Sequence, residues 1–254
     1  MRVTVLGFAG AAPLEGACSS YVVTDADATV LLDCGPGTLE RLWRMELLER
    51  LDAVVISHMH ADHVLDLVLM AGELCRGMLR ERPALYVPRG GRQVLADLDR
   101  VFSGTAARAS RFDEAFVLSE YEADDRLRVG ELELSFAETA HRGLCCAVRV
   151  SDGRTALVYG ADGAASTAVE ALARGADLLI LEATYPDDRG LAAAQGHMTA
   201  LQAGELAARA GARGLWLTHL LPGNQARSLE LAAQAFDGDL GLACASEGLT
   251  LELA

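Results

Sequence analysis

Three histidines and one aspartate stand within six positions of SHMHADHV, residues 57–64. The chain has six histidines, so half of its imidazoles are gathered here. The apolar run AVVI at 53–56 directly precedes this stretch and is typical of a strand buried on both faces. Side chains at such a strand exit can converge on one cleft, where neutral imidazoles and a carboxylate suit zinc and its first-row neighbours. The expected metal ligands in this stretch are His58, His60, Asp62 and His63.

The remaining histidines and one further aspartate stand in comparable places. His141 (ETAHRG) and His219 (LTHL) each follow a predicted strand, while His197 lies in QGHMTA. Asp162, in VYGADG, follows the predicted strand TALVY and has glycines on both sides. A carboxylate at such a position can approach two cations and bridge them, although an isolated aspartate there would cap the next helix. Because the other ligands are present, we expect Asp162 to bridge two metals.

The motifs HMHADH, His141, Asp162 in YGAD and His219 in LTHL, in this order and at strand ends, resemble those of the metallo-β-lactamase superfamily. The resemblance extends from VTVLGFAGAAP through LLDCGPGT to the last strand. It implies an α/β fold of four layers, the αββα sandwich, with two mixed sheets face to face and helices outside. It further implies one metal held by His58, His60 and His141, a second held by Asp62, His63 and His219, and Asp162 between them.

Two other segments bear on the chemistry that the resemblance implies. LLILEATY with Glu182 and QGHMTA with His197 are similar to the HEAT and HST motifs of tRNA 3′-processing endonucleases and their small phosphodiesterase relatives. By that resemblance, His197 contacts the scissile phosphate or the leaving group, and Glu182 orients the His197 ring. Two metals lower the pKa of a bridging water and provide a hydroxide nucleophile, which Asp62 is expected to aim. The implied catalytic residues are Asp62, Glu182 and His197.

The composition of the chain argues against a long nucleic acid substrate. It has 36 acidic and 22 basic residues, a formal net charge of -14, and no lysine. Proteins that bind nucleic acids normally neutralise phosphates with a basic surface. In addition, the span from His63 to His141 has no room for the long basic arm of the tRNA endonucleases. We therefore expect a small anionic substrate, such as a cyclic nucleotide or a cyclic sugar phosphate.

Other functions stay open at this point. The same centre can attack a carbonyl carbon, so a hydrolase of a lactone, thioester or β-lactam in secondary metabolism is the alternative, and tRNA 3′-processing is a weaker one. A metal-stabilised binding or scaffold protein is disfavoured because the ligand set is complete. Two divalent ions are expected, with zinc favoured, and the ligand types suit manganese and iron as well.

The coarse pattern of the sequence predicts one α/β domain over residues 1–254. Helices are expected at 37–50, 63–82, 90–102, 164–173, 198–211 and 224–236, and strands at 2–6, 20–24, 28–33, 53–56, 84–87, 127–136, 145–150, 155–159, 177–181 and 214–218. Residues 103–125 have weak periodicity and are interpreted as a loop over the active-site face. The helix at 63–82 is apolar around much of its circumference, which indicates either deep burial or a homodimer contact.

The sequence also predicts the cellular compartment of the protein. No window approaches the 18 or more apolar residues that a membrane span needs. The six cysteines have neither CxxC spacing nor the pattern of a short secreted framework, so they are interpreted as reduced thiols. We therefore expect a cytoplasmic protein with no membrane partner.

Overall fold

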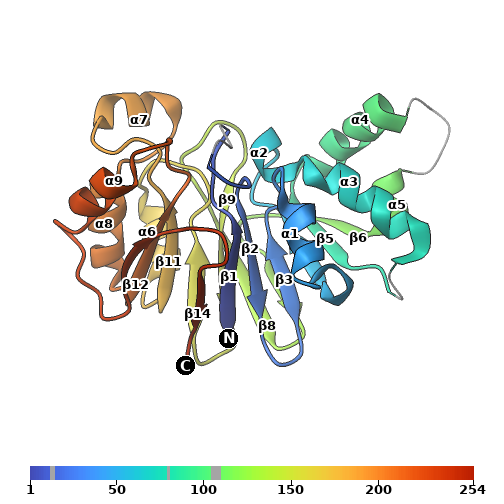
Figure 1. Cartoon of the computed structure of the whole chain (residues 1–254), viewed down its shortest axis with the longest axis horizontal. Coiled ribbons are helices and arrows are strands. Elements are labelled where there is room, and N and C mark those ends of the chain that lie inside the picture. Colours follow the sequence, from blue (N-terminus) through green and yellow to red (C-terminus); the bar gives the residue numbers. More distant parts are fainter. Residues whose placement is uncertain (12–14, 79–80, 104–109) are drawn as a thin grey trace.

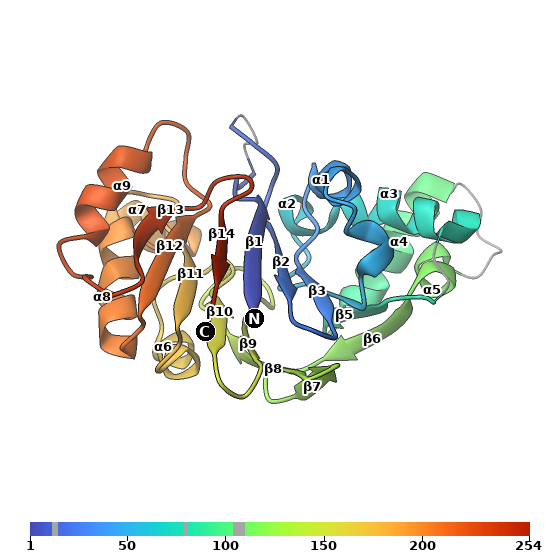
Figure 2. The same ribbon diagram turned by 60° about the horizontal axis from the view of Figure 1, so that its bottom comes forward.

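Two seven-stranded sheets lie face to face in the computed structural model of the chain, which describes residues 1–11, 15–78, 81–103 and 110–254 (Figure 1). Helices cover the outer face of each sheet, so the predicted αββα arrangement is confirmed (Figures 1 and 2). Within these described ranges, none of the helices has the length and apolar character needed to cross a membrane.

The first sheet has the strand order β14-β1-β2-β3-β4-β5-β6. Its strands are β1 (Arg2–Gly7), β2 (Ser20–Thr24), β3 (Thr29–Leu32), β4 (Ala53–Val55), β5 (Ala84–Pro88), β6 (Val117–Tyr121) and β14 (Thr250–Glu252). The helices beside it are α1 (Thr38–Arg44), α2 (Ala61–Val64), α3 (Asp66–Glu73), α4 (Gly91–Ser103) and α5 (Arg111–Ala115), with a 3₁₀ turn at Leu48–Arg50 and a π-helical turn at Leu74–Met78. Because β1 pairs with β14, the two chain ends lie side by side (Figure 2).

The second sheet has the order β13-β12-β11-β10-β9-β8-β7. Its strands are β7 (Arg126–Val129), β8 (Leu132–Glu138), β9 (Cys146–Ser151), β10 (Ala156–Tyr159), β11 (Leu178–Glu182), β12 (Gly214–Thr218) and β13 (Gly241–Cys244). The helices of this half are α6 (Thr167–Ala173), α7 (Arg189–Gln195), α8 (Ala200–Ala210) and α9 (Gln225–Ala232). Strands β10 to β13 run parallel, so their carboxyl ends meet at one edge of the sheet.

The central strands are apolar along most of their length because both of their faces are buried. In β4, Val55 faces the core between the sheets, whereas Val54 packs against the helices outside. The same alternation holds in β11, where Ile180 faces the central core and Leu179 the outer one. Continuous apolar runs are the expected pattern for parallel strands covered on both sides.

Four sequence-based expectations differ from the structure. The helix predicted at 37–50 ends at Arg44 and is followed by the separate 3₁₀ turn at Leu48–Arg50. The helix predicted at 63–82 is divided into α2, α3 and the π-helical turn among its described residues. The strand predicted at 127–136 is the hairpin of β7 and β8, which turns at Gly130 in the left-handed region (φ 56°). The loop expected at 103–125 is wrong for residues 110–125, which contain α5 and the edge strand β6, while residues 104–109 lie outside the described ranges.

Candidate metal centre

The structure brings all seven predicted metal ligands together at the strand exits of the two sheets. His58 and His60 lie between β4 and α2, while Asp62 and His63 lie in α2 itself. The second sheet contributes the other three after β8, β10 and β12, namely His141, Asp162 and His219. Their donor atoms form two groups, one of His58, His60 and His141, and the other of Asp62, His63, Asp162 and His219. This is the division that the family resemblance implied.

The three-histidine group has the spacing of ligands around one ion. His58 Nε2 lies 3.0 Å from His60 Nδ1, and His141 Nε2 lies 3.2 Å from the same atom. A tetrahedral zinc with bonds of about 2.0 to 2.1 Å places its ligand atoms roughly 3.3 Å apart. The three nitrogens therefore face one another at a distance that suits a shared cation.

The second group combines two imidazoles with two carboxylates. Asp162 Oδ2 lies 3.2 Å from His219 Nε2 and 3.5 Å from His63 Nε2, and Asp62 Oδ2 lies 3.3 Å from His219 Nε2. The same Asp162 oxygen lies 3.9 Å from His58 Nε2 in the first group. Asp162 thus stands between the two groups, where its carboxylate can reach both.

One buried atom tests whether these residues fit metal ions. His63 Nε2 is buried and has no hydrogen-bond partner among the described residues. A buried ring nitrogen without a partner is costly, and a cation at this position would satisfy it. The donor types, imidazole nitrogen and carboxylate oxygen, also match zinc and related divalent metals. The site therefore fits a pair of divalent ions.

The ligand histidines differ in their affinity for protons. Burial lowers the pKa of His58 well below its usual value and so favours the neutral, metal-binding ring. Burial acts in the same direction on His219, but the carboxylates of Asp162, Asp62 and Glu182 outweigh it and raise the pKa of His219 to about 9. Without a metal, protons take the place of the missing positive charge in the second group.

Asp33 is a buried residue of the site that the sequence analysis did not single out. It follows β3, and its carboxylate accepts hydrogen bonds from His63 Nδ1 (2.6 Å), from Tyr159 (2.7 Å), and from both the backbone nitrogen and the hydroxyl of Ser57 (2.7 Å each). A carboxylate directly after the buried strand TVLL was the available clue, since such an exit faces the same edge as β4.

Glu182 and His197, which the resemblance implied as catalytic residues, lie beside the second group. His197 Nδ1 lies 2.8 Å from Glu182 Oε1, and Glu182 has no exposed surface. The His197 ring is centred 5.1 Å from that of His141 and 5.3 Å from that of His219. The buried Glu182 carboxylate therefore fixes the His197 ring through Nδ1. The imidazole of His197 lies next to the rings of His141 and His219.

Local backbone geometry holds these segments in place. Asp33, Ala161 and His219 have positive φ angles of 59°, 52° and 56°, so the exits of β3, β10 and β12 each turn through the left-handed region at a non-glycine residue. Such conformations are costly and persist where the surroundings fix them. His197 lies between α7, whose C-cap is Gly196, and α8, whose capping box is formed by Thr199 and Gln202.

Comparison with known proteins places this fold and site in a family. The model of the beta-lactamase superfamily domain matches residues 28–220. "Probable metallo-hydrolase YhfI" of Bacillus subtilis (strain 168) is 34% identical over 222 residues, which cover 87% of each chain. The crystal structure of the metallo-β-lactamase fold protein YhfI from the same species superimposes with a TM-score of 0.87 at 29% identity, over 99% of both chains.

Two further proteins are similar to this chain, one in sequence and one in fold. Ribonuclease Z of Haloarcula marismortui is 30% identical over 296 residues, covering 96% of this chain and 94% of that protein. The Zn²⁺-bound structure of PqqB from Methylobacterium extorquens shares the fold, with a TM-score of 0.73 at 17% identity over the whole of both chains. The chain belongs to the metallo-β-lactamase superfamily and has the paired histidine and aspartate clusters of its metallo-hydrolases.

Proposed function

We propose that this chain is a binuclear metal-dependent hydrolase that cleaves a small, preferably cyclic, phosphodiester. The observation on which the proposal rests is the Glu182–His197 pair, which places a supported imidazole beside the two donor groups. Hydrolysis at phosphorus benefits from a group that can donate a proton to the departing oxygen.

The residues proposed to hold the metals are His58, His60 and His141 for one, and Asp62, His63 and His219 for the other, with Asp162 shared. When bound, two divalent ions supply an activated water and neutralise negative charge that develops on the phosphoryl oxygens. Zinc is the preferred ion, and manganese or iron are the alternatives.

Asp62 has a second role in the proposal. Its carboxylate is partly exposed at 14%, whereas that of Asp162 is 4% exposed, so Asp62 is the more accessible of the two aspartates. A carboxylate at this place can accept a hydrogen bond from the attacking water and aim it at the substrate.

His197 is proposed to act on the leaving group. Its Nδ1 is hydrogen-bonded to Glu182, so Nε2 is the ring nitrogen that can contact a substrate. The side chain is 15% exposed, which leaves it accessible from the site. Protonated at Nε2, His197 can stabilise the charged phosphoryl group and donate its proton to the departing oxygen.

The size of the substrate follows from charge and from the relatives. Ribonuclease Z is by name an enzyme that acts on RNA, which supports phosphorus as the target. A net charge of -14 without a lysine opposes binding of a long polyanion, so a small phosphodiester is preferred to tRNA. The six free cysteines agree with a reducing compartment, and we expect the protein to act in the cytoplasm.

A substrate panel tests the proposal against its competitors. Zinc-loaded protein would be assayed with cyclic nucleotides, bis(p-nitrophenyl) phosphate, a precursor tRNA, acyl lactones, a thioester and a chromogenic cephalosporin. We expect the cyclic phosphodiesters to give the highest kcat/KM. A higher kcat/KM for a carbonyl substrate would contradict the proposal and favour the lactone, thioester or β-lactam hydrolase. A higher kcat/KM for precursor tRNA would contradict it and favour the tRNA endonuclease.

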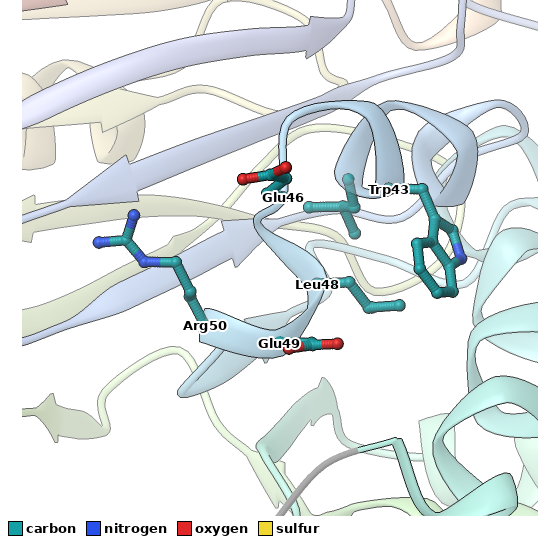
Figure 3. Close-up of a pocket in the computed structure, with 6 residues that line it drawn as sticks. Trp43, Glu46, Leu48, Glu49 and Arg50 are labelled. Atoms are coloured by element: carbon teal, nitrogen blue, oxygen red, sulfur yellow. The ribbon is translucent and has the colours of Figure 1, made fainter.

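We also propose a homodimer through the 63–82 helix, with Leu69 of that helix and the neighbouring Trp43 as its contact residues. These side chains are 60% and 44% exposed, whereas most apolar residues of α3 are buried in the protein's own core. Trp43 borders a hollow of about 530 Å³ lined also by Leu48, Glu46, Glu49 and Arg50 (Figure 3). Because this rim has charges of both signs, a second copy related by a two-fold axis can pair acids with bases.

A further inference from the structure

Two hydroxyl groups beneath the candidate metal centre occupy equivalent places in the two halves of the sandwich. Ser57 lies at the exit of β4 in the first sheet, and Thr184 follows β11 in the second. Each hydroxyl stands between a fully buried carboxylate and a predicted metal-binding histidine. Neither residue was expected to take part in the site from the sequence.

In the first half, the carboxylate is Asp33. Ser57 Oγ lies 2.7 Å from Asp33 Oδ2 and 3.0 Å from His58 Nδ1. An ionised carboxylate only accepts hydrogen bonds, so the single hydroxyl proton of Ser57 is donated to Asp33. The hydroxyl then has only lone pairs left for His58, and the proton between them must belong to His58 Nδ1.

In the second half, the carboxylate is Glu182. Thr184 Oγ1 lies 2.7 Å from Glu182 Oε2 and 2.8 Å from His219 Nδ1. By the same count of protons, Thr184 donates to Glu182 and accepts from His219 Nδ1. Each half also has one histidine bound directly by the carboxylate, which is His63 on Asp33 and His197 on Glu182.

We propose that Ser57 and Thr184 are positioning residues. Each forms a relay, a hydrogen-bonded chain from a buried carboxylate through the hydroxyl to Nδ1 of His58 or His219, and thereby holds Nε2 of that ring free for metal. A histidine whose Nδ1–H is fixed by an acceptor presents Nε2 as its lone-pair atom. Groups that orient a metal-binding histidine in this way affect metal affinity by roughly 10- to 100-fold. The inference rests on the proposed metal site and is independent of the substrate.

The relay differs from a purely structural role in what it predicts for each ring. A structural role alone would satisfy the two carboxylates and would leave the ring atom that binds metal unspecified. The relay instead assigns Nδ1–H and metal-bound Nε2 to His58 through Ser57, and to His219 through Thr184. Loss of one hydroxyl should therefore affect one ring and leave the other unchanged.

Zinc competition titration with a chromophoric chelator, combined with ¹⁵N NMR of the histidine rings, tests the relay. The chain has only six histidines, which keeps the ring signals assignable. The variants are Thr184→Val and Ser57→Ala, and the conservative controls are Thr184→Ser and Ser57→Thr. Thermal unfolding of each metal-free variant separates loss of folding from loss of metal binding.

The expected result is a zinc affinity lowered by roughly 10- to 100-fold in Thr184→Val, with the His219 ring altered and the His58 ring as in wild type. Ser57→Ala should show the reverse, and both controls should stay near wild type. Unchanged affinity in the folded variants would overturn the inference. If a variant does not fold, the zinc-loaded wild type decides, because metal bound through Nδ1 of His58 or His219 would contradict the relay directly.

Discussion

Asp162 Oδ2 lies 3.5 Å from Nε2 of His63, a buried ring nitrogen that has no hydrogen-bond partner in the described part of the chain. The same oxygen lies 3.2 Å from His219 Nε2 and 3.9 Å from His58 Nε2. One carboxylate oxygen is therefore within reach of imidazoles from both donor groups. This relationship is the physical basis for the proposal that two metals share Asp162 as a ligand.

Replacement of Asp162 by asparagine should reduce the binding of both metals. The amide removes the negative charge that both ions share, so we expect fewer than two zinc ions per chain by elemental analysis. Activity should fall by at least roughly 10²-fold, as for removal of one electrostatic partner of the transition state. The matched control is Asp124→Asn, a change of the same chemistry at an exposed turn. An Asp162→Asn protein that retains two tightly bound zinc ions would contradict the bridging role.

His197→Ala should lower turnover in a way that depends on the leaving group. Without a proton donor, a cyclic nucleotide with an alkoxide leaving group should lose roughly 10²- to 10⁴-fold in kcat. Bis(p-nitrophenyl) phosphate should lose less, because p-nitrophenolate departs without protonation. Zinc content should stay at the wild-type level, since His197 lies outside both proposed ligand sets. Equal losses on the two substrates would argue against general acid catalysis by His197.

Zinc binding should depend on pH through His219. The pKa of His219 rises from 6.5 to about 9 in the metal-free folded protein, so its proton stabilises the fold below pH 6.5, and this stabilisation is lost as the pH rises through about 9. His63, whose pKa is raised by Asp162 and Asp33 against the effect of burial, acts in the same direction. Zinc must displace these protons, so its affinity should increase over the same range.

Thermal unfolding and zinc competition between pH 6.5 and 9 measure both trends. We expect the Tm of the metal-free protein to fall with pH while zinc affinity rises, and His219→Gln should flatten both slopes. A metal-free Tm that increases over this range would show that His219 does not hold an additional proton in the folded state.

The proposed homodimer should depend on Leu69. Leu69→Glu introduces a charge beside Trp43 at the proposed contact of the 63–82 helix, so it should convert a dimer into a monomer in light scattering. Val101→Glu is the matched control, because Val101 is 74% exposed on α4 and does not line the hollows beside Trp43. A wild-type monomer, or equal dissociation by both variants, would contradict this contact.

The metal-binding residues were more predictable from the sequence than the residues that hydrogen-bond to them. Metal-binding side chains must follow strand exits, and the runs AVVI and TALVY mark two of those exits locally. Asp33 and Thr184 support histidines that lie 30 and 35 positions away, so nothing in their own neighbourhoods indicates the pairing. Such contacts arise only when the exits of neighbouring strands, β3 with β4 and β11 with β12, come together in the folded sheets.

The helix boundaries show a similar limit. The apolar pattern at 63–82 correctly indicates burial, since Leu67, Met70 and Ala71 are inside the core. The pattern does not show where the helix divides, because the apolar run continues across Leu65, which separates α2 from α3. Likewise, β6 is an edge strand whose exposed residues weaken its periodicity, so the sequence alone indicated a loop.

The most direct test of the account is the rate of cyclic phosphodiester hydrolysis as zinc is returned to metal-free protein. We predict negligible turnover without metal and full turnover only when two zinc ions are bound per chain, with Asp162→Asn at least roughly 10²-fold slower throughout. Turnover by the metal-free protein, or none on any phosphodiester with two zinc ions bound, would contradict the account.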